Sequence, residues 1–299
     1  MKVLLTGPTG QVGSHLSRLT AALGQSLAVG RDRMDLARPD TIREVIREAR
    51  PDVIVNAAGF THVDHAEAQP ALVWAVNAVA PGVMAEEAKR LGALLVHYSS
   101  VYVFDGTAAG AYTEADAPNP INEYGKSKLA GEHAIAAVGA VALILRASWV
   151  YDVRGRNFVN TMLRLAAECE ELRVVDDQRG SPAWARSIAE VTVAILRNPA
   201  RARDAAGIYN LASRGSVTRY DFTRRTLDLT REERTAQPRL TRIKTSDFPL
   251  PAARPLNSVL DTARLAALFS VPIDDWETQL HACLDAVRAR AHWTPPARH

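Results

Sequence analysis

The sequence predicts an α/β protein built on a doubly wound parallel sheet, with a smaller α+β lobe supplied mostly by the second half of the chain. Short continuous apolar runs, rather than alternating ones, indicate strands buried on both faces. These runs alternate with amphipathic helical stretches, which is the element order of a parallel sheet covered by helices. Beyond residue 147 the strands become shorter and prolines more frequent, which indicates a different architecture.

The elements of the sheet follow one another in regular order. Strands are expected over residues 3–5, 27–29, 53–55, 94–96 and 143–145, and helices over residues 12–23, 42–49, 72–91 and 126–138. A closing helix is expected over residues 274–290. We therefore predict a first domain over residues 1–147, to which the chain returns around 184–215, and a lobe formed by 148–183 and 216–299.

Composition bounds the class of protein. A chain of 299 residues is long enough for about two structural units. Its 36 Lys and Arg against 33 Asp and Glu give a net charge of +3, dispersed along the chain, so no nucleic-acid-binding tail is expected. Cys169 and Cys283 have the spacing of neither a disulfide framework nor a zinc site. No apolar run is long enough to span a membrane, and we expect a cytoplasmic protein.

Three glycines lie between the first strand and the first helix. Gly7, Gly10 and Gly13 have the spacing G-x-x-G-x-x-G, a variant of the dinucleotide-binding fingerprint of Rossmann-type sheets. Glycine lets the backbone approach a pyrophosphate, and the N–H groups at the helix start face its negative charge. The expected phosphate cradle comprises Gly7, Thr9, Gly10, Gln11, Val12 and Gly13.

The end of the second strand indicates which dinucleotide is bound. Arg31 and Arg33 could hold a ribose 2′-phosphate, whereas Asp32 could bind a 2′-hydroxyl. We favour NADPH, with NADH as the alternative. Asp35-Leu36, which we place at a third strand, could present a carboxylate to the adenine amino group or could serve as a cap or turn.

A tyrosine and a lysine four residues apart indicate proton transfer. On a helix, residues four apart such as Tyr124 and Lys128 lie on one face. A neighbouring ammonium lowers the pKa of a phenol, so Tyr124 could protonate a carbonyl oxygen as hydride reaches its carbon. The partner hydroxyl is expected at the end of the 94–96 strand: Ser100 is preferred and Ser99 is the competitor. A surface pair and a strand-end cap are the structural alternatives.

On these residues the chain resembles the extended short-chain dehydrogenase/reductase family, and within it the branch that reduces a dTDP-linked keto-sugar. The resemblance extends from residue 1 to about residue 286. Further motifs that carry it are PDVIVNAA (51–58), VDHAE (63–67), YVFDG (102–106), SWVY (148–151), NFV (157–159), DQRGSP (177–182) and RPLNS (254–258). It implies a Rossmann cofactor domain, a nucleotide-sugar lobe, and hydride transfer from NAD(P)H to C4 of dTDP-4-dehydro-β-L-rhamnose, giving dTDP-β-L-rhamnose for surface polysaccharide.

The resemblance also implies roles for residues around the cofactor. Ala57, Ala58 and Gly59 would let the backbone lie close to the nicotinamide ribose, and Asn77 would support the same side. The dTDP-sugar is the implied partner, with neither a nucleic acid nor a membrane expected.

Other residues would form the substrate side. Tyr102 and Trp149 would line the sugar pocket, although each could instead be a core aromatic. Asn157, Arg254 and Asn257 are candidates for contact with dTDP or for the pocket wall. Arginine suits a diphosphate, but Arg254 could equally anchor the lobe through a carboxylate.

Three positions depart from the family pattern. Ser100 replaces a threonine and keeps the hydroxyl, whereas Val101 replaces an aspartate and removes a hydrogen-bond acceptor for a sugar hydroxyl. His15 and Arg186 stand where some members bind Mg²⁺ through glutamates. Because Mg²⁺ takes oxygen ligands, we predict no metal there, and a monomer or a homodimer held by other contacts.

Two alternative functions stay open. Val101 would suit a related nucleotide-sugar 4-ketoreductase with a different sugar. A non-catalytic NADP-binding regulatory subunit is the alternative from another class. Intact Ser100, Tyr124 and Lys128 disfavour it, because a pure binding protein needs no proton donor.

Overall fold

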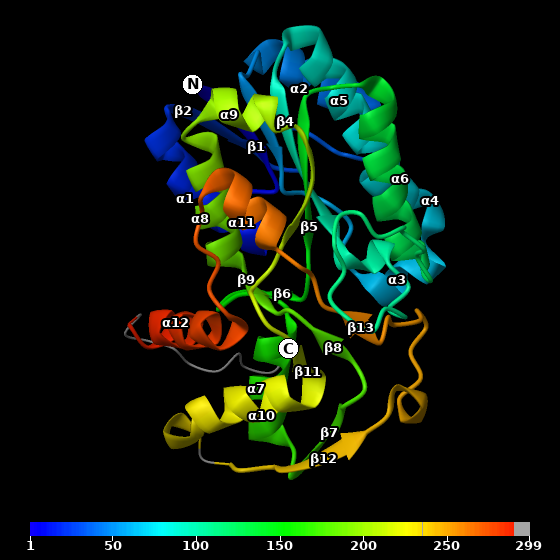
Figure 1. Cartoon of the computed structure of the whole chain (residues 1–299), viewed down its shortest axis with the longest axis vertical. Helices are drawn as coiled ribbons and strands as arrows, with labels where there is room; N and C mark the ends of the chain where they lie inside the picture. Colours follow the sequence, from blue (N-terminus) through cyan, green and yellow to red (C-terminus); the bar gives the residue numbers. More distant parts are fainter. Residues whose placement is uncertain (235, 290–299) are drawn as a thin grey trace.

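A six-stranded parallel sheet forms the centre of the larger domain in the computed structural model, which describes residues 1–234 and 236–289 (Figure 1). The strand order is β10-β5-β4-β3-β1-β2, and every neighbouring pair is parallel. The strands are β1 (Lys2–Thr6), β2 (Gln25–Val29), β3 (Val53–Asn56), β4 (Leu94–Ser100), β5 (Ala142–Ala147) and β10 (Gly207–Leu211). The predicted α/β class is confirmed, with all five expected strands present and β10 added from the 184–215 segment.

Helices cover both faces of the sheet (Figure 1). On one face Leu16 and Ile188 join the sheet in a first apolar core, and on the other Ile46, Met84 and Ile135 join it in a second. The helices of this domain are α1 (Gln11–Leu19, extended by a 3₁₀ turn over Thr20–Leu23), α2 (Pro39–Ala49), α5 (Ala80–Leu91), α6 (Glu123–Val138), α8 (Ala185–Leu196), α9 (Pro199–Asp204) and α11 (Ala263–Phe269).

The single helix expected over residues 72–91 is interrupted. It consists of α4 (Pro70–Trp74), a π-helical turn (Ala75–Val79) and α5, preceded by the short α3 (Val63–Ala68). Pro81 has no N–H to donate to the carbonyl of Asn77, which lies one helical turn before it. That carbonyl is instead packed against Gly131 of α6, where an added Cβ would lie 2.2 Å from the oxygen. The wider turn therefore lets α6 approach closely at Asn77.

The lobe is built from small sheets and three longer helices. Tyr151, Trp184, Phe222 and Leu280 belong to its own apolar core. Its strands form three small sheets: β6 (Val150–Tyr151) with β9 (Ala183–Trp184), β7 (Glu171–Val175) with β12 (Arg239–Ile243), and β8 (Arg179–Gly180) between β11 (Val217–Thr218) and β13 (Asn257–Ser258). Its helices are α7 (Phe158–Glu168), α10 (Arg219–Leu229) and α12 (Trp276–Arg288). Two 3₁₀ turns cover Arg231–Glu233 and Thr245–Asp247.

One stretch assigned to the lobe packs with the larger domain instead. Leu260, Leu265, Phe269 and Ile273 belong to the first apolar core, although we predicted that residues 216–299 form the lobe. The ring of Phe269 meets that of Tyr209 on β10 edge to face, 5.5 Å between centroids. The edge strand β10 needs this cover, so the chain crosses back once more; residues 290–299 lie outside the described part.

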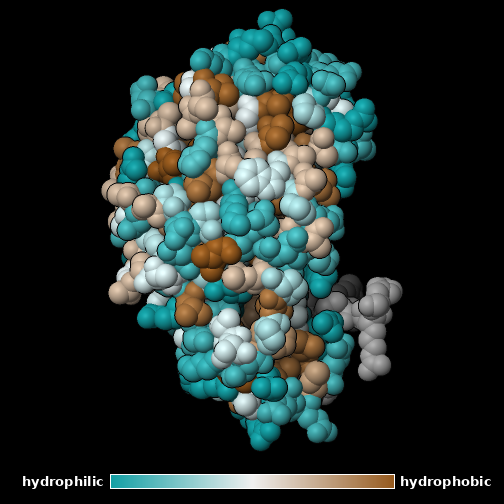
Figure 2. Space-filling view, turned by 90° about the vertical axis from the view of Figure 1, so that its right-hand side faces the viewer, coloured by the Kyte–Doolittle hydropathy of each residue, from teal (hydrophilic) through white to brown (hydrophobic). Residues whose placement is uncertain are grey.

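The part of the chain that the structure describes contains no helix suited to crossing a membrane. Within residues 1–234 and 236–289, no helix is both long and apolar enough to cross a bilayer. On the face shown in Figure 2, apolar residues lie singly or in small groups among hydrophilic ones. Such scattered exposure is ordinary for a globular surface.

A buried ion pair fixes α6 against the sheet. Glu132 on α6 accepts two hydrogen bonds from Arg146 on β5, at 3.0 and 2.7 Å, and both side chains are about 97% buried or more. Ser99 on β4 donates to the same carboxylate at 2.5 Å. This network sets how α6 lies relative to β4 and β5.

We expect Glu132→Gln to destabilise the protein by about 3–5 kcal/mol, because Arg146 would be left as a buried charge without its counter-charge. Urea unfolding measures the change. Glu190→Gln is the matched control, since its pair with Arg186 is exposed and such pairs contribute about 0–1 kcal/mol. Equal losses in the two variants would contradict this account of α6.

Candidate functional site

The glycine loop after β1 touches the loop after β3. Gly7 has a φ of +66°, and a Cβ there would lie 2.9 Å from the carbonyl oxygen of Ala57. A Cβ on Gly13 would lie 1.9 Å from the carbonyl oxygen of Gly7. Gly10, the N-cap residue of α1, donates its N–H to the same oxygen at 3.0 Å. Only glycine permits this packing, which occurs where the strand order reverses, between β1 and β3.

A cavity of about 380 Å³ opens beside these loops at the carboxyl ends of β1, β2 and β3. Seven of the predicted cofactor-binding residues line it: Gly7, Thr9, Arg31, Asp35, Leu36, Ala58 and Gly59. Residues that the sequence analysis missed also line it, among them Met34, Phe60 and His62. Their positions just after β2 and β3 could have indicated them, because ligands bind at the carboxyl ends of the strands in sheets of this kind.

The acidic and basic residues after β2 have different surroundings. Arg31, with 78% of its side chain exposed, lines the cavity and lies 3.6 Å from Asp35. Asp35 also accepts the N–H of Ala37 at 3.0 Å, so it takes the turn role left open above, and residues 35–36 form no strand. Arg33 pairs with Glu48 at 3.1 Å and does not line the cavity.

Asn77 positions the loop that follows β3. Its amide accepts the N–H of Phe60 at 2.9 Å and donates to the Phe60 carbonyl at 3.0 Å and to the Ser127 hydroxyl at 3.1 Å. An added Cβ on Gly59 would lie 3.2 Å from the Asn77 amide oxygen. Asn77 therefore supports the predicted nicotinamide side by bonding loop and helix together, without lining the cavity itself.

Some predicted cofactor residues contribute backbone or packing only. Gln11 and Val12 form the first turn of α1 and do not line the cavity. The side-chain oxygen of Gln11 is buried without a hydrogen-bond partner, and Val12 packs against the first apolar core. Ala57 packs against the same core, so its contribution to the loop is its backbone.

The three predicted catalytic residues lie together between β4 and α6. Asn122 caps α6 by accepting the N–H of Gly125 at 2.7 Å, which places Tyr124 in the first helical turn. A Cβ on Gly125 would lie 2.1 Å from the carbonyl oxygen of Tyr102, so glycine is what allows α6 to approach so closely. Ser100 interacts with Tyr124.

The competitor Ser99 takes another role. As its neighbour Ser100 faces Tyr124, Ser99 points to the opposite side of the strand and donates to Glu132. The alternation of side chains along β4 thus favours Ser100 as the hydroxyl at the site.

Burial dominates the acid–base properties of Tyr124. It raises the pKa of the phenol to about 12, against the effect of hydrogen bonding to Ser100, which lowers it. The expected lowering by Lys128 is not seen. The ammonium of Lys128 instead donates to the carbonyl of Tyr98 at 2.5 Å and lies on the side of Gly59. A phenol with this pKa is protonated at neutral pH and can act as a proton donor.

Burial acts in the opposite direction on Lys128. It lowers the pKa of the ammonium to about 8, while the nearby Glu132 raises it. Desolvation disfavours the charged form of lysine. The ammonium is therefore still mostly protonated at pH 7, but it loses its proton only slightly above neutral pH. Below about pH 8 the site therefore carries a positive charge at the Tyr98 carbonyl, near Gly59.

The predicted sugar-pocket aromatics have distinct environments. Tyr102 meets the ring of Tyr124 edge to face, 5.8 Å between centroids. Trp149 has a φ of +42° and packs against Gly180, where a Cβ would lie 2.4 Å from the indole. The guanidinium carbon of Arg219, a residue missed in the sequence analysis, lies 3.5 Å from the centroid of that indole ring. The Trp149 ring is therefore in contact with protein at Gly180 and at Arg219.

Val101 is packed in the protein core. Its side chain is 2% exposed and belongs to the first apolar core. A carboxylate at this place would be desolvated without a partner, which explains why an apolar residue fits here. The departure at Val101 therefore affects packing beside the site.

Arg254, predicted at the substrate, is bonded to protein groups. It pairs with Asp64 on α3 at 2.7 Å and donates to the carbonyl of Ala252 at 2.8 Å. This is the anchoring alternative considered above, and it ties the chain before β13 to the larger domain.

The two asparagines predicted at the substrate are similarly engaged. Asn157 caps α7 by accepting the N–H of Asn160 and donates to the carbonyl of Asp152 at 2.7 Å. Asn257 donates to the carbonyls of Ala108 and Gly110 and accepts the N–H of Val259. Both side chains stabilise loops, because the amide oxygen accepts a backbone N–H and the amide nitrogen donates to backbone carbonyls.

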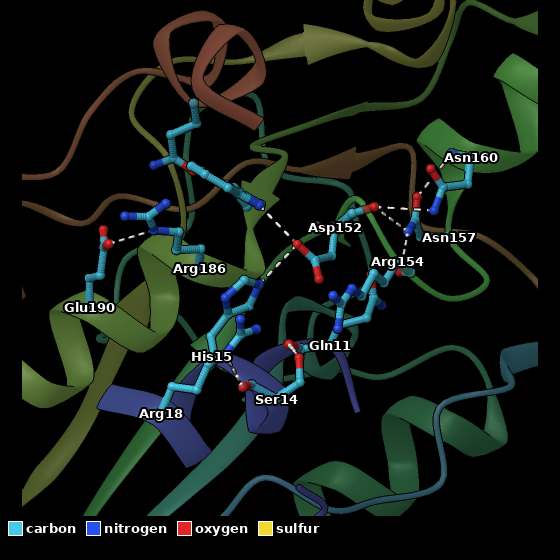
Figure 3. A network of polar contacts seen from close by, with 12 residues as sticks. Gln11, Ser14, His15, Arg18, Asp152, Arg154, Asn157, Asn160, Arg186 and Glu190 are labelled. Atoms are coloured by element: carbon cyan, nitrogen blue, oxygen red, sulfur yellow. Dashed lines mark hydrogen bonds and ion pairs between the residues drawn. The ribbon is translucent and has the colours of Figure 1, made fainter. Parts of the chain in front are cut away.

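The positions compared with magnesium ligands have internal partners (Figure 3). His15 on α1 lies 3.0 Å from the carboxylate of Asp152, which also accepts the indole N–H of Trp184 at 3.0 Å. Arg186 pairs with Glu190. Among the described residues, no group of three or more His, Cys, Asp or Glu side chains could hold a metal ion. The buried contact at Asp152 links α1 to the start of the lobe.

Comparison with known proteins identifies the family. Residues 1–289 match the family described as the RmlD substrate binding domain. The chain is 44% identical over 292 residues to dTDP-4-dehydrorhamnose reductase of Burkholderia thailandensis, covering 95% of this chain and 98% of that one. The chain belongs to the RmlD family.

Other RmlD-like proteins agree with this placement. The crystal structure of dTDP-4-dehydrorhamnose reductase from Bacillus anthracis in complex with NADP has a TM-score of 0.88 and 29% identity, covering 95% of this chain and 99% of that one. A relative in Streptomyces antibioticus, named as a probable dTDP-4,6-dihydroxy-2-methyloxan-3-one 4-ketoreductase, is 36% identical over 100% of this chain and 99% of its own. The family resemblance predicted from the motifs is confirmed.

We expect Gly7→Ala to destabilise this RmlD-family chain by about 1–3 kcal/mol more than Gly92→Ala. Both glycines have a φ near +66°, but a Cβ on Gly92 meets nothing within 4 Å, whereas one on Gly7 meets the loop after β3. The difference in urea unfolding free energy between the two variants isolates that contact. Equal destabilisation would show that the loops can separate without cost.

Proposed function

We propose that this RmlD-family chain reduces the C4 ketone of dTDP-4-dehydro-β-L-rhamnose to dTDP-β-L-rhamnose with NADPH. The observation that carries the proposal is the grouping of Ser100, Tyr124 and Lys128 next to a glycine-lined cavity at the carboxyl ends of the strands. The activity named for the Burkholderia relative supports the choice of sugar.

The residues of the site fit a dinucleotide and a ketone. NADPH, when bound, supplies the hydride. The Ser100 hydroxyl orients the ketone oxygen by donating a hydrogen bond, and the protonated phenol of Tyr124 transfers its proton to that oxygen. The ammonium of Lys128, held by the Tyr98 carbonyl, stabilises the phenolate that remains.

The cofactor side supports a dinucleotide with a 2′-phosphate. At Gly7 and Gly13 an added Cβ would collide with backbone, so the loop is shaped for close approach to a pyrophosphate. Arg31 supplies a cation at the end of β2, where a 2′-phosphate would lie. NADPH is therefore preferred and NADH remains the alternative.

The second candidate is a 4-ketoreductase acting on a different dTDP-sugar, which the Streptomyces relative favours. Val101 does not add to it, because its side chain is in the core. A comparison of kcat/KM on the two keto-sugars decides between the candidates: a higher value on the other sugar would replace the rhamnose assignment. The non-catalytic alternative predicts no turnover on either.

Two free cysteines suit the reducing, cytoplasmic location that we propose.

We expect Tyr124→Phe to lower kcat by about 10²–10⁴-fold, because the proton donor is removed while the ring is kept. NADPH oxidation in the presence of dTDP-4-dehydro-β-L-rhamnose measures the change. Tyr209→Phe is the control, since its hydroxyl bonds the Ala205 carbonyl away from the site and the variant should keep its activity. Undiminished turnover by Tyr124→Phe would rule out this proton donor.

We expect kcat/KM to fall as the pH rises through about 8. The pKa of Lys128 is lowered to about 8, so its supporting charge is present below that pH and lost above it. Tyr124, with a pKa raised to about 12, stays protonated over this range. In a profile from about pH 6 to about pH 10, Lys128→Arg should lose this decline, because the guanidinium does not titrate there. A flat profile for the native protein would contradict the role of Lys128.

We expect Arg31→Ala to weaken NADPH binding by about tenfold and to leave NADH binding unchanged, because only NADPH carries the 2′-phosphate. Protein-enhanced nucleotide fluorescence measures both affinities. Arg33→Ala is the matched control: it removes the same charge two residues away, from a side chain that pairs with Glu48. Loss of discrimination in the control, and not in Arg31→Ala, would assign the phosphate contact to Arg33.

A further inference from the structure

Arg219, the first residue of α10, carries a positive charge without a matching negative one. Its guanidinium lies 3.5 Å from the centroid of the Trp149 ring and 4.5 Å from that of Phe158. Among the ion pairs of the described residues, none includes Arg219. By contrast, the other arginine on this side of the pocket, Arg254, is neutralised by Asp64.

The electrostatic surroundings of Arg219 are those of a cation that lacks an anion. Burial lowers its pKa to about 10, and the positive charge of Arg254 lowers it further, while Tyr102 acts in the opposite direction. Contact with two aromatic faces compensates only part of the lost hydration. An anion beside Arg219 would be attracted by its unpaired guanidinium, and bidentate bonding by arginine suits a phosphate.

The local backbone is built to hold this guanidinium in place. Trp149 adopts a φ of +42°, which is costly for a bulky residue and is maintained only where surrounding structure enforces it. Gly180 packs on the indole so closely that any Cβ would collide with it. The indole is thus held in contact with both Gly180 and Arg219, and it serves as a platform for the cation.

The position of Arg219 relative to the proton donor matches the shape of a nucleotide-sugar. Tyr102 lies between them: its ring meets Tyr124, and its hydroxyl is near enough to Arg219 to raise the pKa of the guanidinium. In a pyranose ring, C4 and C1 are at opposite corners, and the diphosphate is attached at C1. A sugar with its C4 ketone at Tyr124 therefore directs its diphosphate away from the donor, across the side of the pocket where Arg219 lies.

We propose that Arg219 binds the diphosphate of the nucleotide-sugar, with Trp149 and Gly180 positioning its guanidinium. This inference rests on the proposed function, in that it takes the substrate to be a nucleotide-sugar. It transfers to Arg219 the diphosphate contact that the sequence suggested for Arg254, whose guanidinium is already paired with Asp64.

Binding of dTDP and of thymidine to the full-length protein, measured by calorimetry, tests the proposal. Arg219→Gln should weaken dTDP binding on the order of 10- to 100-fold, as expected for the loss of a charge-assisted hydrogen bond, and leave thymidine binding unchanged. Arg219→Lys should recover part of the dTDP affinity, because it keeps the charge without the bidentate geometry.

Arg264→Gln provides the matched control. Arg264 also lies over an aromatic ring, 4.8 Å from the centroid of Tyr209, but it is on α11 and away from the pocket. Its variant loses one positive charge and one aromatic contact, so it should bind dTDP like the native protein. Near-ultraviolet circular dichroism verifies that each variant is folded.

Two results would overturn the proposal. Unchanged dTDP affinity in Arg219→Gln would mean that the diphosphate lies elsewhere, and an equal loss of dTDP and thymidine affinity would mean that Arg219 only shapes the pocket. Failure of the proposed reaction is recognised separately, because binding is measured without turnover. A chain that binds dTDP through Arg219 but does not reduce dTDP-4-dehydro-β-L-rhamnose would refute the sugar assignment and retain the diphosphate contact.

Discussion

The carboxylate of Glu132 is bonded by the guanidinium of Arg146 on one side and by the hydroxyl of Ser99 on the other, in the buried seam between α6 and the strands β4 and β5. Four residues before Glu132 on the same helix is Lys128, and next to Ser99 on the same strand is Ser100. The ion pair therefore sets the helix that carries the lysine in register with the strand that carries the hydroxyl. An apolar contact could hold the two elements together, but it would leave their sliding and rotation less restricted than these directional bonds do.

Close backbone contacts perform the same task on the cofactor side. Gly13 brings α1 against the first loop, Gly7 brings that loop against Ala57, and Gly131 brings α6 against the π-helical turn at Asn77. The amide of Asn77 then bonds the loop after β3 to Ser127. Both halves of the site are thus positioned by α6, through a buried charge at one end and through small residues at the other.

The sequence was sufficient for the parts of the site that depend on local spacing. The glycines between β1 and α1 and the pair Tyr124 and Lys128 each lie within one turn or loop, so their spacing alone indicates their arrangement. The strand β10 was not predicted, because Gly207, Tyr209 and Asn210 interrupt the apolar pattern of a buried strand.

Long-range contacts were out of reach for a related reason. Arg219 and Trp149 meet only because separate segments of the lobe pack together. The spacing of the two residues in the sequence does not predict this contact. Asn157 and Asn257 have the polarity of ligand-binding residues but form loops and caps, a distinction that depends on which backbone groups lie nearby. Whether a polar residue faces a ligand or the protein's own backbone is decided by tertiary structure.

The late arrival of β10 has a consequence for synthesis of the protein. On the ribosome, β1 to β5 emerge before β10, so β5 is temporarily the edge of the sheet, with its unpaired backbone groups and its apolar side chains in water. This edge remains open until residues 207–211 follow, and the cover given by α11 comes later still. The nascent chain therefore passes through a stage in which another strand could add to β5, and that stage is where association with chaperones would be of most use.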